Sequence, residues 1–188
     1  NLKTPIILKH DVEHDIDLAL IIGEIEYKAG ISSTSYLQFD VAISNPRKVI
    51  QLKNMGHDIG YHYDVLDANN GDYEVAMKQF QIHLEAFSDM GIEIKSVCPH
   101  GNPIKIRSGW TSNKDFFRSD EVRKAFPDMI DIVVDREEIF PEELWDVSDA
   151  GYTFKLISDI SNNDRVVAID TNIAMPDDLP IKKCTILI

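Results

Sequence analysis

The sequence has few cysteines, no long apolar run and no apparent leader segment. Its two cysteines, Cys98 and Cys184, lie far apart without a CxxC spacing, so neither a zinc knuckle nor a disulfide framework is indicated. No stretch approaches the roughly 18 consecutive apolar residues of a membrane span, and no charged-then-apolar segment opens the chain. We therefore expect no membrane span, and we favour a reducing, cytoplasmic compartment.

Basic residues are also scarce. The chain has 19 Lys and Arg against 32 Asp and Glu, which gives a formal net charge of -13. Nucleic-acid binding needs clustered Lys and Arg to replace the counterions of the phosphates, so we expect no nucleic-acid partner. The sequence does not indicate the oligomeric state.

Apolar residues are plentiful enough for a full core. With 188 residues, a 44% hydrophobic share and only 8 prolines and 9 glycines, the chain is expected to form one domain over 1–188. It starts at Asn1 rather than Met and ends on an apolar run at 185–188. Both ends fit an excised domain or a processed product, and the carboxyl end fits a truncated domain.

Short apolar runs alternate with amphipathic segments along the chain. Strands are predicted at 5–9, 33–39, 58–63, 92–98, 130–134, 153–157, 166–169 and 185–188. Helices are predicted at 16–29, 46–55, 72–90 and 120–126, and a long polar loop at 102–114. Repeated strand-helix units indicate an α/β fold with a parallel sheet. The number of strands favours closure into a TIM-like (β/α) barrel over an open sheet.

Three histidine-bearing segments stand at or just after predicted strands. They are KHDVE at 9–13, GHDIGYH at 56–62 and CPHG at 98–101. In α/β folds the catalytic face lies at the carboxyl ends of the strands, where these segments fall. Imidazoles and carboxylates gathered at one face indicate a metal-assisted hydrolase.

The first segment carries two candidate carboxylates. Asp11 and Glu13 are two residues apart, so both point to one face if the strand geometry persists. One can hold a metal while the other accepts a proton from water, a combination suited to amide or ester hydrolysis. Asp15 and Asp17 are better explained as an acidic helix start that interacts with the helix dipole.

The histidines divide by their position along the strands. His57 and His62 are five residues apart, and strand alternation sends them to opposite faces. We expect His62 to join the site and His57, which begins the strand, to be structural. His100 follows Pro99 at the end of a strand, where a turn exposes its imidazole. His14 and His83 are interpreted as surface helix positions without a role.

Together these segments carry a resemblance to a known family. ILKHDVEHD, followed by a helix, STSYLQF, GHDIGYHYDVLD and VCPHGNP, resembles the polysaccharide deacetylase superfamily, also called the NodB-homology or carbohydrate esterase family 4 fold. The likeness is closer to the branch with an HDVD-type first motif, and covers most of 5–188. It implies a distorted (β/α) barrel of about seven strands that removes N-acetyl groups from glycans. It also implies a divalent metal, such as zinc, bound by one aspartate and two histidines.

The first motif of the family is only partly present. By this resemblance Asp11 matches the first aspartate and is the candidate catalytic base, whereas the metal-binding aspartate of the family faces Val12. Two alternatives follow. Either Glu13 supplies the missing carboxylate, or Asp11 binds the metal itself and leaves the base to another group.

The later motifs also depart from the family. His62 matches the first histidine of the second motif, but Leu66 replaces the second. His100 lies where the third motif falls, and in this branch it takes over as a ligand. Asp159 is a further polar candidate at a strand end. The family closes its site with Leu-x-Ile followed by a histidine, and this sequence stops at Ile186-Leu187-Ile188. The two alternatives are that the natural chain continues to such a histidine and that it lacks this proton donor.

The sequence thus predicts a metal-dependent hydrolase that removes N- or O-acetyl groups from a carbohydrate. Asp11, His62 and His100 are the expected ligands of a divalent metal, with zinc favoured, and Asp11 and Glu13 the expected catalytic carboxylates. Three aromatic residues, Tyr61, Tyr63 and Trp110, are candidates for stacking on sugar rings.

Two other functions compete with this one. The first is a deacetylase-like domain that binds a glycan without turning it over, as Val12 and Leu66 suggest. The second is an HD-type phosphohydrolase, prompted by His10-Asp11 and His57-Asp58. That class needs an all-helical scaffold, and the alternation of strands and helices disfavours it.

Overall fold

The computed structural model describes residues 6–139, 145–148, 154–157, 166–169 and 184–187. The chain divides into two compact units. One comprises Asn1–Asp11 and Phe140–Ile188, and the other Val12–Ile139. The boundary falls inside the first strand, β1 (Ile6–Val12), whose last residue belongs to the second unit.

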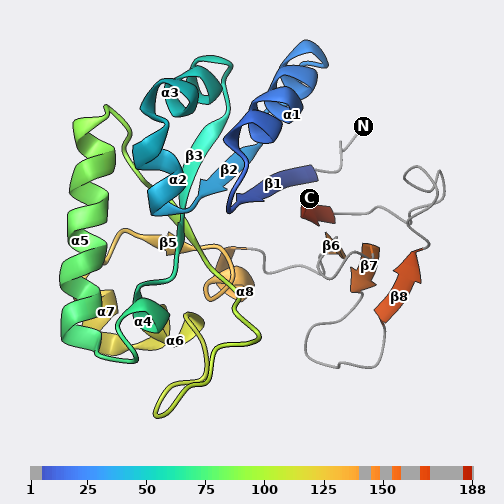
Figure 1. Cartoon of the computed structure of the whole chain (residues 1–188). Coiled ribbons are helices and arrows are strands. Elements are labelled where there is room, and N and C mark those ends of the chain that lie inside the picture. The colour runs from blue at the N-terminus through green and yellow to red at the C-terminus, as the bar shows by residue number, and fades with distance from the viewer. Residues whose placement is uncertain (1–5, 140–144, 149–153, 158–165, 170–183, 188) are drawn as a thin grey trace. The chain divides into compact units, whose positions relative to one another are not determined.

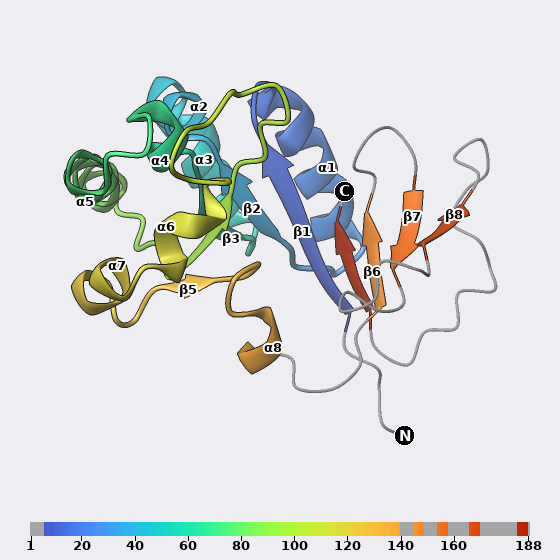
Figure 2. The same ribbon diagram turned by 90° about the horizontal axis from the view of Figure 1, so that it is seen from below.

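The second unit alternates helices with parallel strands. Its strands are β2 (Thr34–Leu37), β3 (Asp58–Tyr63), β4 (Ser96–Pro99) and β5 (Ile130–Asp131), and each pairs in parallel with the next. Its helices are α1 (Ile16–Lys28), α2 (Phe39–Ser44), α3 (Pro46–Asn54), α4 (Val65–Ala68), α5 (Tyr73–Asp89), α6 (Lys114–Arg118), α7 (Asp120–Ala125) and α8 (Arg136–Ile139). Figure 1 shows their order, and Figure 2 shows α3, α5 and α7 outside the strands. No helix in the described part of the chain combines the length and apolar character that a membrane span requires.

The first unit contains strands of both directions. They are β1, β6 (Trp145–Ser148), β7 (Phe154–Ile157), β8 (Val166–Ile169) and β9 (Cys184–Leu187). β9 pairs in parallel with both β1 and β6, while β6 with β7 and β7 with β8 are antiparallel. The sequence pattern did not predict β6, and parallel pairing was expected throughout.

The α/β class is confirmed. Strand-helix alternation and the parallel pairing of β2 to β5 are consistent with a partial (β/α) barrel of the NodB type. Among the described strands, β5 pairs with β4 and β8 with β7, and neither has a second partner. Neither unit by itself closes its described strands into the barrel that was expected.

Local sequence signals explain where several helices begin. The carboxylate of Asp15 caps α1, accepting hydrogen bonds from the backbone N–H groups of Asp17 and Leu18 at 2.9 and 3.0 Å. Asp72 caps α5 in the same way. Such caps satisfy N–H groups that lack a partner in the first turn of a helix. The interpretation of Asp15 as part of a helix start is confirmed.

One face of β3 packs an aromatic core. Tyr61 and Tyr63 are fully buried, and both rings contact Phe80 of α5, with centroid distances of 5.4 and 5.9 Å. Phe116 and Phe117 of α6 also pack against Tyr63. The stacking of Tyr61 or Tyr63 on a sugar is therefore wrong, because both rings are already covered by protein.

Gly60 allows a close approach on the opposite face of β3. A Cβ atom at this position would collide with the ring of Tyr36, which stands opposite it on β2. The Tyr36 ring lies over Gly60, where a side chain would otherwise stand. Its hydroxyl is 3.0 Å from Ser96 Oγ of β4. Three neighbouring strands are thereby tied together below the end where His62 lies.

Two histidines outside the candidate site are structural. His57 is buried at the start of β3, where its Nε2 hydrogen points to the carbonyl oxygen of Gly23 at 2.9 Å and its Nδ1 accepts from Ser33 N at 3.2 Å. This confirms its expected structural role. His83, expected on the surface, is instead buried in α5 and lies 2.6 Å from the Tyr61 hydroxyl. Strand β3 covers the face of α5 that carries it.

Candidate metal centre

Three side chains meet at the carboxyl ends of the strands. Glu13 directly follows β1, His62 is the penultimate residue of β3, and His100 directly follows β4. His62 stands opposite Cys98 in the parallel register, so the chain leaving β4 brings His100 past it. All three residues belong to the unit Val12–Ile139.

The Glu13 carboxylate is the centre of this group. Its Oε1 atom lies 3.3 Å from Nε2 of His62 and 3.3 Å from Nε2 of His100. The centroids of the two imidazole rings are 5.2 Å apart, and the rings are nearly perpendicular, at 88°. Each side chain offers one possible ligand atom, and these atoms lie within 4.8 Å of one another.

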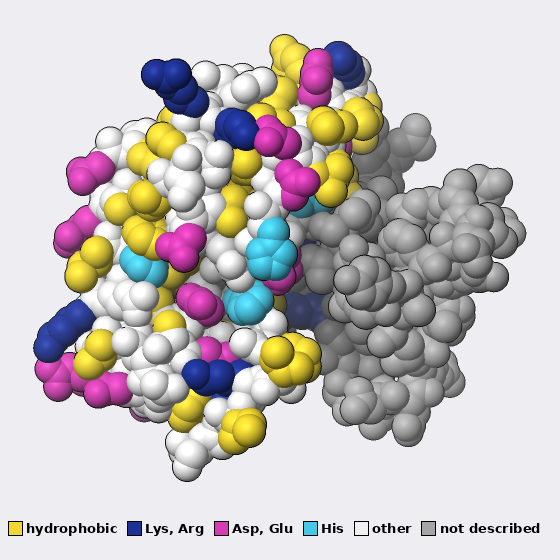
Figure 3. Space-filling view, in the orientation of Figure 1, with side chains coloured by type: hydrophobic (Ala, Val, Ile, Leu, Met, Phe, Trp, Pro, Cys, Tyr) yellow, Lys and Arg dark blue, Asp and Glu magenta, His cyan; other side chains and the backbone are white. Residues whose placement is uncertain are grey.

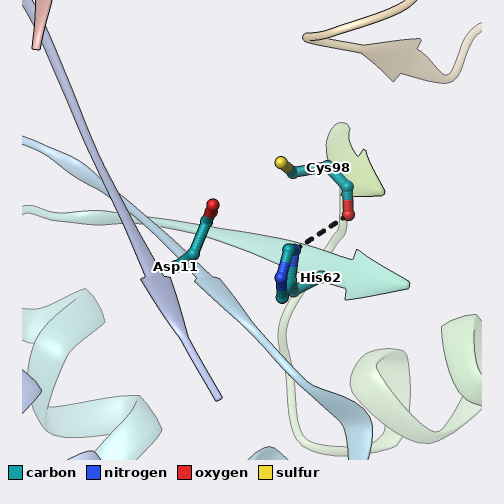
Figure 4. A group of neighbouring side chains, drawn as sticks. All are labelled: Asp11, His62 and Cys98. Atoms are coloured by element: carbon teal, nitrogen blue, oxygen red, sulfur yellow. Dashed lines mark hydrogen bonds between the residues drawn. The ribbon is translucent and has the colours of Figure 1, made fainter. Parts of the chain in front are cut away.

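The hydrogen bond from His62 to the main chain decides its tautomer. Nδ1 lies 3.1 Å from the carbonyl oxygen of Cys98, and because a carbonyl only accepts, Nδ1 carries the hydrogen (Figure 4). In a neutral ring the lone pair is then on Nε2, which faces Glu13. A carboxylate oxygen and an unprotonated nitrogen attract one another only through a shared proton or a cation.

A divalent metal fits this arrangement. Nitrogen and oxygen ligands held tetrahedrally about 2.0–2.2 Å from zinc lie about 3.3–3.6 Å from one another. The two 3.3 Å distances from Glu13 match that spacing. A hydrogen bond from the second ring nitrogen to a carbonyl is also the usual support of a metal-bound histidine. The described residues thus group atoms able to bind a divalent metal.

Glu13 is held in its charged form. Without a metal, the contact between Glu13 and His62 is a hydrogen bond only when Nε2 of His62 also carries a hydrogen, which it then donates to Glu13. This hydrogen bond and the nearby His100 lower the pKa of Glu13, although burial opposes them. Asp64, which directly follows β3, is a second acidic group close to the two imidazoles. Burial raises the pKa of Asp64, while His100 acts in the opposite direction. The sequence did not single out Asp64, because nothing in its local pattern separates it from a turn residue.

The centre is open on one side. The side chain of His62 is only 3% exposed, that of His100 is 18% and that of Glu13 is 38%. Figure 3 shows histidine and acidic side chains gathered on the face seen in Figure 1. A ligand can therefore reach Glu13 while His62 stays enclosed.

The other residues that the sequence motifs singled out lie outside the group of Glu13, His62 and His100. Asp11, whose side chain is drawn in Figure 4, is the last residue of the first unit. Its Oδ1 accepts a hydrogen bond from Lys9 Nζ at 2.7 Å. Its role as ligand or base stays a prediction. Val12 and Leu66 are 6% and 0% exposed in the core, so these positions contribute packing. Asp159 lies outside the described residues.

A group of polar residues that the sequence did not reveal borders the centre. Asp67 of α4 binds Arg107, Trp110 and Asn113, which all come from the segment after His100. The polar loop at 102–114 was suspected of a function, but its partner on α4 is about forty residues away in the chain. Trp110, proposed to stack on sugars, packs against Gly71 and donates its Nε1 hydrogen to Asp67.

Known structures share this fold. Peptidoglycan deacetylase PdaC from Bacillus subtilis superposes with a TM-score of 0.53 at 17% identity, over 80% of this chain and 63% of that one. A family 4 carbohydrate esterase from Streptomyces lividans gives 0.51 at 16%, over 78% and 65%. BA3943 from Bacillus anthracis, described as a pseudoenzyme of the same family, gives 0.52 at 15%, over 69% and 43%.

These likenesses concern the fold. No model of a known protein family matches the sequence, and no curated protein sequence matches it. The chain spans less than two thirds of the length of the three structures. Within Val12–Ile139, the alternation of strands and helices and the parallel pairing of the strands are those that the sequence predicted. The chain has the NodB-homology fold of the family 4 carbohydrate esterases.

Proposed function

We propose that this chain is a metal-dependent hydrolase that removes N- or O-acetyl groups from a carbohydrate. The observation that carries the proposal is the position of Glu13, whose Oε1 atom is 3.3 Å from Nε2 of both His62 and His100. The fold supports the same reaction class, because the similar structures include proteins described as a peptidoglycan deacetylase and a carbohydrate esterase.

Glu13, His62 and His100 would hold the metal in this proposal, and zinc suits their nitrogen and oxygen donors. When bound, the metal supplies polarisation of the acyl carbonyl and activation of water. Glu13 brings the negative charge that offsets the cation, and His62 brings a nitrogen whose direction is set by the carbonyl of Cys98.

Asp11 is the proposed second carboxylate. It precedes Glu13 by two residues and is partly exposed, with 27% of its side chain accessible. A general base accepts the water proton, so a carboxylate separate from the ligands suits this role. Lys9 binds the Asp11 carboxylate and restricts its rotamers. In the alternative, Asp11 is a metal ligand and Glu13 is the base. Asp11→Asn should then lose the metal, and Glu13→Gln should keep the metal and lose turnover.

A glycan-binding domain without catalysis is the second candidate. Val12 and Leu66 occupy core positions where the family resemblance implies an aspartate and a histidine. Similar structures also include a family 4 pseudoenzyme and a mutant of that protein with restored activity. The fold is therefore compatible with both an active and an inactive centre.

Metal content and acetate release separate these candidates. The purified chain is stripped with a chelator, reloaded with Zn²⁺ and assayed on N-acetylated and O-acetylated oligosaccharides. We expect about one metal per chain and release of acetate. Glu13→Gln and His62→Gln should lose the metal, whereas Asp11→Asn should keep it and lose turnover. Absence of both metal binding and acetate release overturns the hydrolase.

His57→Gln is the matched control for His62→Gln. Both histidines are 3% exposed, but His57 lies at the opposite ends of the strands. We expect this control to lower stability and to leave metal content unchanged. If it lost metal as His62→Gln does, the loss would reflect the removal of a buried histidine rather than of a ligand.

A further inference from the structure

The segment that leaves His100 is anchored on α4 by one buried carboxylate. Asp67 accepts hydrogen bonds from Arg107 Nε and Nη2 at 2.7 and 2.5 Å, from Trp110 Nε1 at 2.7 Å and from Asn113 Nδ2 at 3.0 Å. Burial alone would raise the pKa of Asp67, but the hydrogen bonds from Arg107 and Trp110 outweigh it and keep the group charged. Charge-assisted bonds of this kind are stronger than neutral ones.

Asn113 connects this anchor to the candidate metal centre. Its side chain is fully buried, and its Oδ1 accepts from the backbone N–H of Asp67 at 2.9 Å. Its Nδ2 donates both to Asp67 Oδ2 and to the carbonyl oxygen of His100, the latter at 2.9 Å. The partners decide the amide orientation, because an N–H must meet an oxygen and a carbonyl must meet an N–H.

His100 is consequently held by its main chain on both sides. Its N–H donates to the carbonyl oxygen of Tyr63 on β3 at 2.8 Å, and its own carbonyl accepts from Asn113. These two bonds fix the peptide groups on either side of its Cα atom. The imidazole extends from that atom, so they set the starting point from which it reaches Glu13.

We propose that Asn113 and Asp67 are positioning residues that place the His100 imidazole at ligand distance from Glu13. The proposal rests on the metal centre proposed above and extends it to two residues that act through the backbone of His100. Metal sites tolerate displacements of only about 0.5 Å in their ligands, so a loosened anchor weakens binding even when all ligands are present.

Metal affinity tests this directly. The affinity of the full chain for Zn²⁺ and for Co²⁺ is measured by competition with a coloured chelator, in wild type, Asn113→Ser and Asp67→Asn. Loss of a residue that supports a metal ligand costs about 10–100-fold in affinity, and we expect a loss in this range for both variants. Thermal unfolding in the presence of chelator verifies that each variant is folded.

A double-mutant cycle identifies the route of the effect. In a His100→Ala background, Asn113→Ser should cause no further loss of affinity, because the residue it positions is gone. Ser33→Ala is the control for loss of a buried polar contact. Ser33 bonds to Glu26 and lies beside His57 at the opposite ends of the strands. We expect this control to lower the unfolding temperature and to leave the affinity for Zn²⁺ nearly unchanged from wild type.

The outcomes distinguish the two proposals. The positioning role alone is overturned if wild type binds Zn²⁺ and the folded variants Asn113→Ser and Asp67→Asn bind it equally well. The positioning role is also overturned if Asn113→Ser lowers the affinity for Zn²⁺ equally with and without the His100 imidazole, since the effect would then not pass through that residue. Wild type that binds neither metal overturns the metal centre and the positioning role together.

Discussion

The imidazole of His83 lies flat against the ring of Phe39, with 3.5 Å between the ring centroids and 7° between the planes. His83 belongs to α5 and Phe39 to α2, and the Tyr61 hydroxyl of β3 closes the third side at 2.6 Å from Nδ1. This enclosure lowers the pKa of His83 to about 4 by burial, although Asp40 acts in the opposite direction.

The first prediction concerns stability against pH. The unfolded chain binds a proton at His83 near its ordinary pKa of 6.5, whereas the folded chain binds it only near 4. The free energy of unfolding therefore falls as the pH is lowered from about 6.5 towards 4, and the contribution of His83 is complete above 6.5. We expect a loss of about 1–2 kcal/mol between pH 7 and pH 5 from this residue.

Urea unfolding at pH 7 and pH 5 measures this loss, with His83→Gln as the comparison. A glutamine does not titrate, so the variant should lose less stability than wild type over the same interval. Equal losses in the two proteins would show that other groups account for the acid sensitivity.

The second prediction concerns the buried pair Tyr63 and Asp131. The Tyr63 hydroxyl donates to Asp131 Oδ2 at 2.6 Å, and burial raises the pKa of Asp131 in spite of this bond. Tyr63→Phe leaves a buried acceptor without this donor, which should cost about 1–3 kcal/mol in unfolding free energy. Tyr36→Phe is the matched control, because its hydroxyl bonds to the neutral Ser96 and should cost less. A larger loss for Tyr36→Phe contradicts the prediction.

The third prediction concerns Gly71, which combines a positive φ with a close contact. Its φ is +84°, and a Cβ atom there would lie 2.5 Å from Cε3 of Trp110. Gly71→Ala should therefore both strain the backbone and displace Trp110 from Asp67. At Gly91, φ is +76° and a Cβ atom would meet no heavy atom within 4 Å, so Gly91→Ala adds backbone strain alone.

Left-handed strain costs about 1–2 kcal/mol at a non-glycine residue, and we expect Gly91→Ala to fall in this range. Gly71→Ala should exceed it, and its tryptophan fluorescence should shift because the indole moves. Urea unfolding and emission spectra check both points. Equal costs and unchanged emission for the two variants would mean that Trp110 accommodates the methyl group.

The fourth prediction concerns the effect of metal on stability. A ligand that binds only the folded state adds about 2.7 kcal/mol when its concentration is about one hundred times its dissociation constant. Zn²⁺ should therefore raise the unfolding temperature of wild type, and chelator should reverse the rise. His100→Gln should reduce the rise, because one of the three donors is lost and Glu13 and His62 bind the metal more weakly by themselves. A rise of undiminished size in this variant would assign the stabilising metal to another site.

Much of the secondary structure follows from local sequence. β3 occupies the predicted residues 58–63, and α1 begins at Ile16, directly after its cap at Asp15. Periodicity and capping depend on residues a few positions apart, so they can be interpreted without knowledge of the fold. The prediction failed where strands of opposite direction occur, because the apolar pattern of β6, β7 and β8 does not indicate which neighbour each strand pairs with.

His83 shows how local patterning can mislead. The buried positions of α5 include Ala76, Phe80, His83 and Phe87, a spacing of four, three and four residues. Val75 in the first turn of the same helix is apolar, but its side chain is 45% exposed. The spacing of Phe80, His83 and Phe87 indicates one buried helix face. His83 was assigned to the surface because histidine is polar.

The sequence by itself determined that His62 and His100 stand at the ends of strands and that carboxylates follow the first strand. Only the tertiary structure decided that Glu13 contacts both imidazoles, although it is 49 residues from His62 in the chain. It also decided that Val12 and Leu66 are core residues, and that Asn113 reaches His100 from a loop anchored on Asp67. The physical reason is that strand register and loop anchoring bring distant residues together, whereas local patterns carry no information about such partners.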